Sequence, residues 1–156
     1  MLDFIGVYRV LAVIDGDGFI GAHTISNEVL EFRLYGIDAP EIKVCKKLRQ
    51  DEKELHIPGE LLIQLGTISA TFLRSVLPVN TLLTLKQERQ NKADKYGRML
   101  CYAFVQDGSS INEILVSEGY AKPYTNIYCS ELSKFQLLNI LAKQNGKGLY
   151  NLVPAF

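Results

Sequence analysis

The sequence lacks an excess of charge, a cysteine framework and a long apolar run. Its 17 basic and 17 acidic residues give a formal net charge of zero, so any attraction for a polyanion has to be local. Its three cysteines, Cys45, Cys101 and Cys129, are odd in number and show no CxxC spacing, which argues against a disulfide framework and a zinc site. There is no run of about 18 uncharged apolar residues, and we therefore expect no membrane-spanning segment.

Internal repeats and low-complexity tracts are also absent. The 156 residues, of which 47% are hydrophobic and 22% charged, have the size and composition of one globular domain. The apolar N-terminus contains Asp3 and Arg9 and shows no small-residue cleavage site, so we expect a first strand there rather than a signal peptide. We expect a single domain over residues 1–156 that acts as a monomer, and the sequence assigns it no compartment.

Apolar runs bounded by turn residues predict five strands. They cover residues 7–14, 19–25, 29–37, 81–86 and 99–105. The first three are joined by short turns, which is typical of an antiparallel sheet or a small barrel. Cys101 lies in the apolar fifth strand, where we expect it to be part of the core.

Three helices are predicted, mostly after the strands. The first opens at Pro58 and ends at Pro78, and its apolar residues recur every three or four positions. The second begins at Ser110, which has capping-box spacing to Glu113, and the third covers about residues 130–146. Residues 42–57 are charged and are predicted to form a long loop. This order of elements predicts the α+β class.

Three charged clusters stand at strand ends or turns: residues 15–18 (DGDG), Arg33 with Asp38 and Glu41, and residues 95–98 (KYGR). Each cluster alone has an ordinary structural explanation. The first is a hairpin turn rich in Asp and Gly. The second is an internal salt bridge between the arginine and either acid, because an unpaired buried charge is costly. The third is a solvated loop.

Taken together, the clusters contain the groups that phosphodiester hydrolysis needs. Asp17, Asp38 and Glu41 carry hard oxygen ligands, which suit Ca²⁺ or Mg²⁺. Arg33 and Arg98 carry guanidinium groups, which match phosphate oxygens in pairs and stay protonated. Glu41 is also able to take a proton from an attacking water, and a metal ion would polarise the phosphoryl oxygen.

Five ordered blocks resemble the staphylococcal nuclease-like (thermonuclease) family. They are VIDGDG (13–18), RLYGIDAPE (33–41), DKYGR (94–98), INEILVSEGYAK (111–122) and GLY (148–150). The resemblance implies an α+β, OB-fold five-stranded barrel with three helices. It also implies a Ca²⁺-dependent nuclease that cleaves single-stranded DNA and RNA with little sequence specificity and leaves 3′-phosphate and 5′-hydroxyl ends.

The resemblance further implies which residues act in the reaction. The implied catalytic residues are Arg33 and Arg98, which stabilise the transition state, and Glu41, the general base. The implied Ca²⁺ ligands are the side chains of Asp17 and Asp38 and the backbone carbonyl of Ala39.

Four further residues are implied to bind substrate. Lys95 and Tyr96 match positions that contact the terminal phosphate of a bound nucleotide. Tyr124 and Tyr128 follow the second helix, where tyrosines of the family line the base pocket. Stacking of bases on such rings tolerates any sequence, which suits a nuclease without sequence preference.

The chain departs from the family pattern at several positions. Gly18 and Ala39 replace threonines, and the charged segment 42–57 is longer than in the best-known member. The basic residues of that segment, among them Lys47, offer local attraction for phosphate, although a solvated loop explains them equally well. Two other functions stay open: an OB-fold nucleic-acid-binding module that does not cleave, and a structural domain in which the charged clusters are salt bridges.

Overall fold

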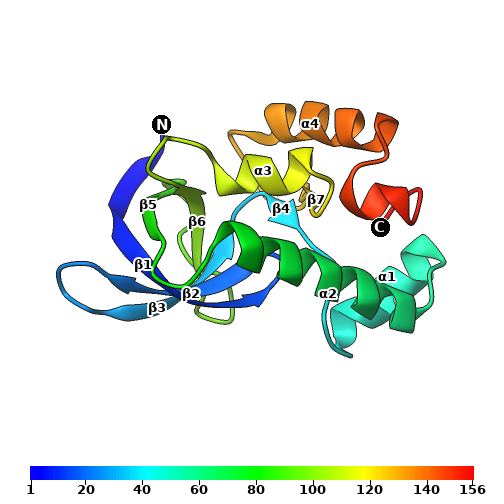
Figure 1. The fold of residues 1–156 in the computed structure, drawn as a ribbon, viewed down its shortest axis with the longest axis horizontal. Helices are drawn as coiled ribbons and strands as arrows, with labels where there is room; N and C mark the ends of the chain where they lie inside the picture. Colours follow the sequence, from blue (N-terminus) through cyan, green and yellow to red (C-terminus); the bar gives the residue numbers. More distant parts are fainter.

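A closed five-stranded barrel forms the centre of the protein, as a computed structural model that describes all 156 residues shows (Figure 1). The strands are β1 (Asp3–Asp15), β2 (Gly18–His23), β3 (Val29–Leu34), β5 (Leu82–Gln87) and β6 (Met99–Phe104). Their order around the barrel is β1-β2-β3-β6-β5. Neighbouring strands are antiparallel except β3 and β6, which run parallel. The predicted α+β class and OB-fold barrel are confirmed.

The helices gather to one side of the barrel (Figure 1). They are α1 (Lys46–Leu55), α2 (Gly59–Val76), α3 (Ile111–Ser117) and α4 (Leu132–Gln144), followed by a 3-10 turn at Gly148–Asn151. A small sheet of β4 (Ile37–Asp38) and β7 (Lys122–Pro123) lies between the barrel and these helices. None of the helices combines the length and the apolar character that a membrane crossing requires.

Two hydrophobic cores hold these layers together. The larger one fills the barrel, where the rings of Phe19 and Phe32 stack at 5.2 Å between centroids. Cys101 is fully buried there, as expected, and all three cysteines are free. The second core joins α1 and α2 to the C-terminal residues, and it is made of Leu48, Leu62, Leu65, Ala142, Leu149, Tyr150, Val153 and Phe156. Figure 1 accordingly shows the C-terminus next to α1 and α2.

The prediction of a loop over residues 42–57 is wrong, because α1 forms there and raises the number of α-helices from three to four. The Cys45 sulfur caps α1 by accepting a hydrogen bond from the Leu48 backbone at 3.5 Å. Ion pairs between Lys47 and Asp51 and between Arg49 and Glu52 stabilise its exposed face. Leu48 is the one buried residue of the helix, so the sequence shows no apolar stripe.

Candidate active site

Arg33 is the best-buried cation of the three charged clusters, with 14% of its side chain exposed. It lies on β3 directly opposite Gly18 of β2, which brings its side chain to the turn that holds Asp17. Its Nη2 donates hydrogen bonds to Asp17 Oδ2 at 3.3 Å and Asp38 Oδ1 at 3.1 Å. The salt-bridge interpretation is therefore right for Asp38, whereas Glu41 is not a partner of Arg33.

Backbone carbonyls fix the rest of the Arg33 guanidinium. Its Nη1 donates to the carbonyl oxygens of Ile37 at 3.2 Å and Leu34 at 3.4 Å. Four of its five N–H groups thus have acceptors, and the orientation of the group is set by the fold. Burial disfavours the charged guanidinium, but the nearby carboxylates of Asp17 and Asp38 outweigh that effect and raise the Arg33 pKa.

The tight turn between β1 and β2 aims Asp17 at the same place. The Asp17 side chain is buried, and its Oδ2 also accepts a hydrogen bond from the Ala39 backbone at 2.9 Å. A Cβ at Gly16 would lie 2.7 Å from the Cβ atoms of Ala39 and Ser69, so only glycine allows this approach. A Cβ at Gly18 would lie 2.9 Å from a carboxylate oxygen of Asp15, which gives a local reason for the glycine where the family has threonine.

Helix α1 adds a cation that the sequence did not assign to the site. Lys47 Nζ lies 3.1 Å from Asp38 Oδ2, 3.4 Å from Glu41 Oε1 and 3.1 Å from Asp51 Oδ2. The sequence interpretation grouped Lys47 with basic residues that attract phosphate from a loop. The spacing of Lys47 and Asp51, four residues apart, is the signal that could have indicated a helix here. We refer to Asp17, Asp38 and Glu41 together as the acid set.

Burial disfavours the ionised forms of Asp38, Glu41 and the neighbouring Asp15. Burial raises the pKa of Asp38 and of Glu41, although Lys47 opposes the shift in both. Burial and the neighbouring Asp17 raise the pKa of Asp15 to about 7. Shifts of this kind mean that the ionised carboxylates are held at a cost in free energy, and an added cation would relieve that cost.

The donors suit a hard divalent ion in their chemistry. Carboxylates and a backbone carbonyl are the ligands that Ca²⁺ prefers in proteins, and the excess of negative charge points the same way. In the observed arrangement no three acidic, histidine or cysteine side chains converge on one point. Arg33 and Lys47 each contact one oxygen of Asp38. The residues therefore fit a hard cation in kind and charge, with two protein cations already in contact with them.

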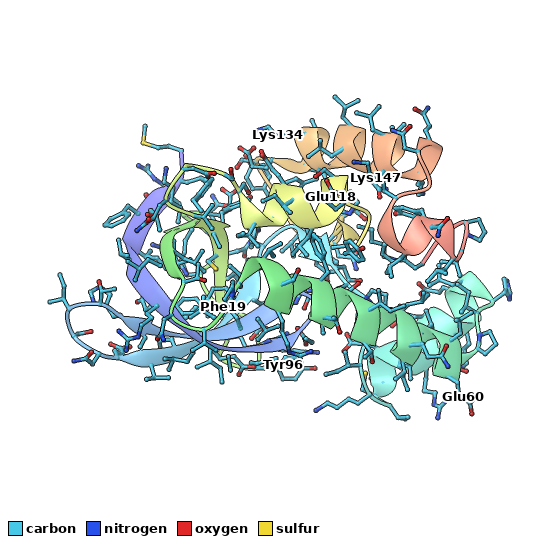
Figure 2. The ribbon with its side chains drawn as sticks, viewed as in Figure 1. Phe19, Glu60, Tyr96, Glu118, Lys134 and Lys147 are labelled. Carbon is cyan, nitrogen blue, oxygen red and sulfur yellow. The ribbon has the colours of Figure 1, made fainter.

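The third charged cluster forms a separate turn just before β6. Asp94 accepts hydrogen bonds from the backbone N–H groups of Tyr96 at 2.9 Å and Arg98 at 3.0 Å, and from Arg98 Nε at 2.7 Å. Tyr96 is 72% exposed, and its ring lies 5.2 Å from Lys95 Nζ and 5.7 Å from Arg98 Cζ. Figure 2 shows Tyr96 at the lower edge of the molecule. We refer to residues 94–98 as the 94–98 turn.

The parallel pairing of β3 with β6 determines the position of the 94–98 turn relative to Arg33. Arg33 lies opposite Leu100, so Arg98 stands two residues before the partner of Arg33 on the neighbouring strand. No hydrogen bond or ion pair joins Arg98 to the acid set, and Asp94 is its carboxylate partner. The fold thus places Arg98 in the turn directly before β6, the strand that neighbours the one holding Arg33, without direct contact between the two arginines.

The two candidate tyrosines differ in position. The Tyr124 ring centroid lies 5.6 Å from Arg33 Cζ, and the Tyr124 backbone N–H donates to the Gly36 carbonyl at 2.9 Å. Tyr128 is 67% exposed, and its carbonyl accepts a hydrogen bond from the Tyr35 hydroxyl. The structure therefore brings Tyr124 to the site, whereas it shows no contact between the Tyr128 ring and Arg33.

Comparison with known proteins gives three related chains. The "Uncharacterized protein MJ1439" of Methanocaldococcus jannaschii is 30% identical over 155 residues, which cover 92% of this chain and 70% of that protein. "Endonuclease YhcR" of Bacillus subtilis is 30% identical over 145 residues, or 89% of this chain but 11% of the relative. An "Uncharacterized endonuclease" of Escherichia coli O157:H7 is 28% identical over 143 residues, covering 92% and 76% of the two chains.

A family match completes the comparison. The family model described as "Staphylococcal nuclease homologue" matches residues 31–152, which include Arg33, Asp38, Glu41 and Arg98, while Asp17 precedes the matched region. The match covers more than half of the chain. Together with the barrel and the order of the charged clusters, it confirms the family that the sequence blocks indicate: the chain belongs to the staphylococcal nuclease homologues.

Proposed function

We propose that the protein is a Ca²⁺-dependent nuclease that hydrolyses phosphodiester bonds of single-stranded DNA and RNA with little sequence specificity. The products are a 3′-phosphate and a 5′-hydroxyl. The observation that carries the proposal is that Arg33, with 14% of its side chain exposed, contacts both Asp17 and Asp38, while Glu41 shares Lys47 with Asp38. Family membership and the endonuclease names of two relatives support it.

Arg33 stabilises the phosphate as it gains charge in the transition state. Its guanidinium is already oriented, so little reorganisation is needed when a phosphate arrives. The Arg33 Nε–H has no acceptor in the protein, so it is available to a phosphate oxygen. A second phosphate oxygen would accept from Nη2 in place of Asp17 or Asp38. Arg98, in the turn before the adjacent strand, binds the same phosphate with its Nη groups, since Asp94 engages Nε.

Glu41 takes the proton from the attacking water. Burial raises its pKa, which makes the carboxylate a stronger base than an exposed glutamate. One of its oxygens lies near Lys47, and its side chain is 27% exposed, so water has access to it. The residues that would hold Ca²⁺ are Asp17, Asp38 and the Ala39 carbonyl. Bound Ca²⁺ supplies positive charge that polarises the phosphoryl oxygen.

The remaining substrate contacts come from exposed groups. Lys95 and Tyr96 in the 94–98 turn bind a neighbouring phosphate of the single strand. Tyr124, beside Arg33, and Tyr128 offer ring faces on which bases stack. Such stacking contributes about 1–3 kcal/mol per base and accepts any base.

A nucleic-acid-binding module that does not cleave is the second candidate. The same barrel and the same exposed tyrosines would serve it. The enzyme is favoured because Arg33, Glu41 and Arg98 are all present in one chain, and binding alone does not need a general base. Salt bridges of Arg33 with Asp38 and of Lys47 with Glu41 are also what a purely structural domain would contain, and the cleavage assay decides between the two.

One assay separates these functions. Purified protein is incubated with single-stranded DNA, duplex DNA and RNA in Ca²⁺, in Mg²⁺ and in EGTA. We expect cleavage of the single strands in Ca²⁺ that stops in EGTA, with product ends that require removal of a 3′-phosphate before polymerase extension. Undiminished cleavage in EGTA contradicts the metal assignment. Gel-shift binding with no cleavage in either metal identifies the binding module instead.

A further inference from the structure

The ammonium of Lys47 occupies oxygens that the proposed metal ion would need. It lies 3.1 Å from Asp38 Oδ2 and 3.4 Å from Glu41 Oε1. We propose that Lys47 is a tethered counter-cation, which competes with Ca²⁺ for the acid set and thereby sets the affinity of the site for metal. This inference rests on the proposed function, because it concerns the same acid set.

Helix α1 holds Lys47 at this place from both sides. The next residue, Leu48, is 1% exposed and belongs to the second core. The preceding Cys45 caps the helix. The backbone at Lys47 is therefore anchored, while its long side chain is 36% exposed. The anchored start of the helix places the ammonium of Lys47 at the acid set.

Asp51 provides the place to which Lys47 withdraws. Its Oδ2 lies 3.1 Å from Lys47 Nζ, one helical turn away. Asp51 is not among the proposed metal ligands. When a metal ion takes Asp38 and Glu41, the ammonium keeps one carboxylate partner on its own helix, so its displacement does not leave the charge unpaired.

Competition follows from the number of oxygens and from charge. Ca²⁺ takes six to eight oxygen ligands, so an oxygen of Asp38 that contacts an ammonium is withheld from the metal. An ammonium and a divalent ion on the same carboxylate also repel each other.

The test measures Ca²⁺ binding without nucleic acid, by isothermal titration calorimetry of the full chain. We expect Lys47→Gln to bind Ca²⁺ at least about tenfold more tightly than wild type, which corresponds to about 1.4 kcal/mol. Lys46→Gln is the matched control. It makes the same change of charge on the same helix at an exposed lysine that forms no ion pair, and its affinity should stay within about twofold because salt screens distant surface charges.

A second pair of variants tests the opposite direction. Asp51→Asn removes the resting partner of Lys47, so the ammonium stays on the acid set and Ca²⁺ should bind about threefold or more weakly. Glu54→Gln is its control, since Glu54 lies on the same helix, is exposed and contacts only Gln50. This pair decides the question if Lys47→Gln fails to fold: equal affinities of Asp51→Asn and Glu54→Gln overturn the inference.

Thermal unfolding gives a readout independent of calorimetry. A ligand that binds only the folded state stabilises it by an amount that grows with the logarithm of its affinity, so Ca²⁺ should raise the Tm of Lys47→Gln more than that of wild type. If wild type binds Ca²⁺ and cleaves DNA while Lys47→Gln has unchanged affinity, the inference is wrong and the proposed function stands. If no variant binds Ca²⁺ and cleavage persists in EGTA, the metal assignment and the inference fail together.

Discussion

The acid set and the 94–98 turn each hold an arginine, but they hold it in different ways. Arg33 is bound by two carboxylates and the Ile37 carbonyl from outside its own strand and is 14% exposed. Arg98 is 23% exposed and is bound by Asp94 of its own turn. The guanidinium of Arg33 is thus held by contacts from other elements of the fold, whereas that of Arg98 is held by a residue of its own turn. Removing the two arginines should therefore have different costs for stability and similar consequences for catalysis.

Arg33→Ala should have the largest effect. It leaves Asp17 and Asp38 buried without their guanidinium, and breaking a buried pair costs about 3 kcal/mol or more of unfolding free energy. Cleavage should become undetectable, because the oriented phosphate contact is gone. Urea unfolding in EDTA measures the first effect and the single-strand assay the second. An equal loss of stability in Arg98→Ala would remove the difference between the two regions.

Glu41→Gln tests the acid set without removing an arginine. The amide cannot accept the proton of an attacking water, so we expect hydrolysis to slow by about 10²–10⁴. Nucleotide binding should change little, since Glu41 is not a proposed phosphate contact. Single-turnover rates and nucleotide titrations measure the two quantities, and a variant that keeps the full rate speaks against the general-base role.

Arg98→Lys should slow cleavage by about 10², on the scale of losing one oriented charge contact in the transition state. Lysine keeps the charge and loses the planar fork. The unfolding free energy should change by about 1 kcal/mol or less, because lysine keeps the positive charge beside Asp94 and loses one side-chain hydrogen bond. kcat and urea unfolding are measured on the same preparation. A near-normal kcat would remove Arg98 from the chemistry.

Asp94→Asn should have the smallest effect. Burial opposes ionisation of Asp94, but hydrogen bonds from Arg98 and Tyr96 outweigh it and lower its pKa. A carboxylate with a lowered folded pKa contributes stability above its unfolded pKa of about 3.9 and loses it as pH falls through the folded value. The deficit of the variant in unfolding free energy should thus be full at pH 7 and shrink below about pH 4. A deficit that does not change with pH would contradict this assignment.

Local signals in the sequence were sufficient for most of the fold. Turn residues and apolar periodicity located the barrel strands, and Ser110 indeed caps α3 by accepting from the Glu113 backbone. Helix α1 was missed because it buries a single residue, Leu48, in a core that is shared with α2 and the C-terminal residues. Periodicity within a segment carries no information about such distant partners.

The candidate site was predictable in its residue types and less so in its pairings. Arg33 was expected to pair with Asp38 or Glu41, and the structure shows Asp38 together with Asp17. Asp17 reaches Arg33 because β2 and β3 pair in a register that no local pattern specifies. Lys47 could be placed in the site only once α1 was known.

The parallel pairing of β3 with β6 also has a consequence for folding. The turn with Asp17 joins the adjacent strands β1 and β2 and closes a short loop. Strand β3, which holds Arg33, pairs with β6, which follows Arg98, only when the long segment between them has been enclosed. Contacts between distant residues form more slowly than local ones. A nascent chain would thus hold the acidic turn before the two arginines become neighbours, and the proposed phosphate site would arise only with the closed barrel.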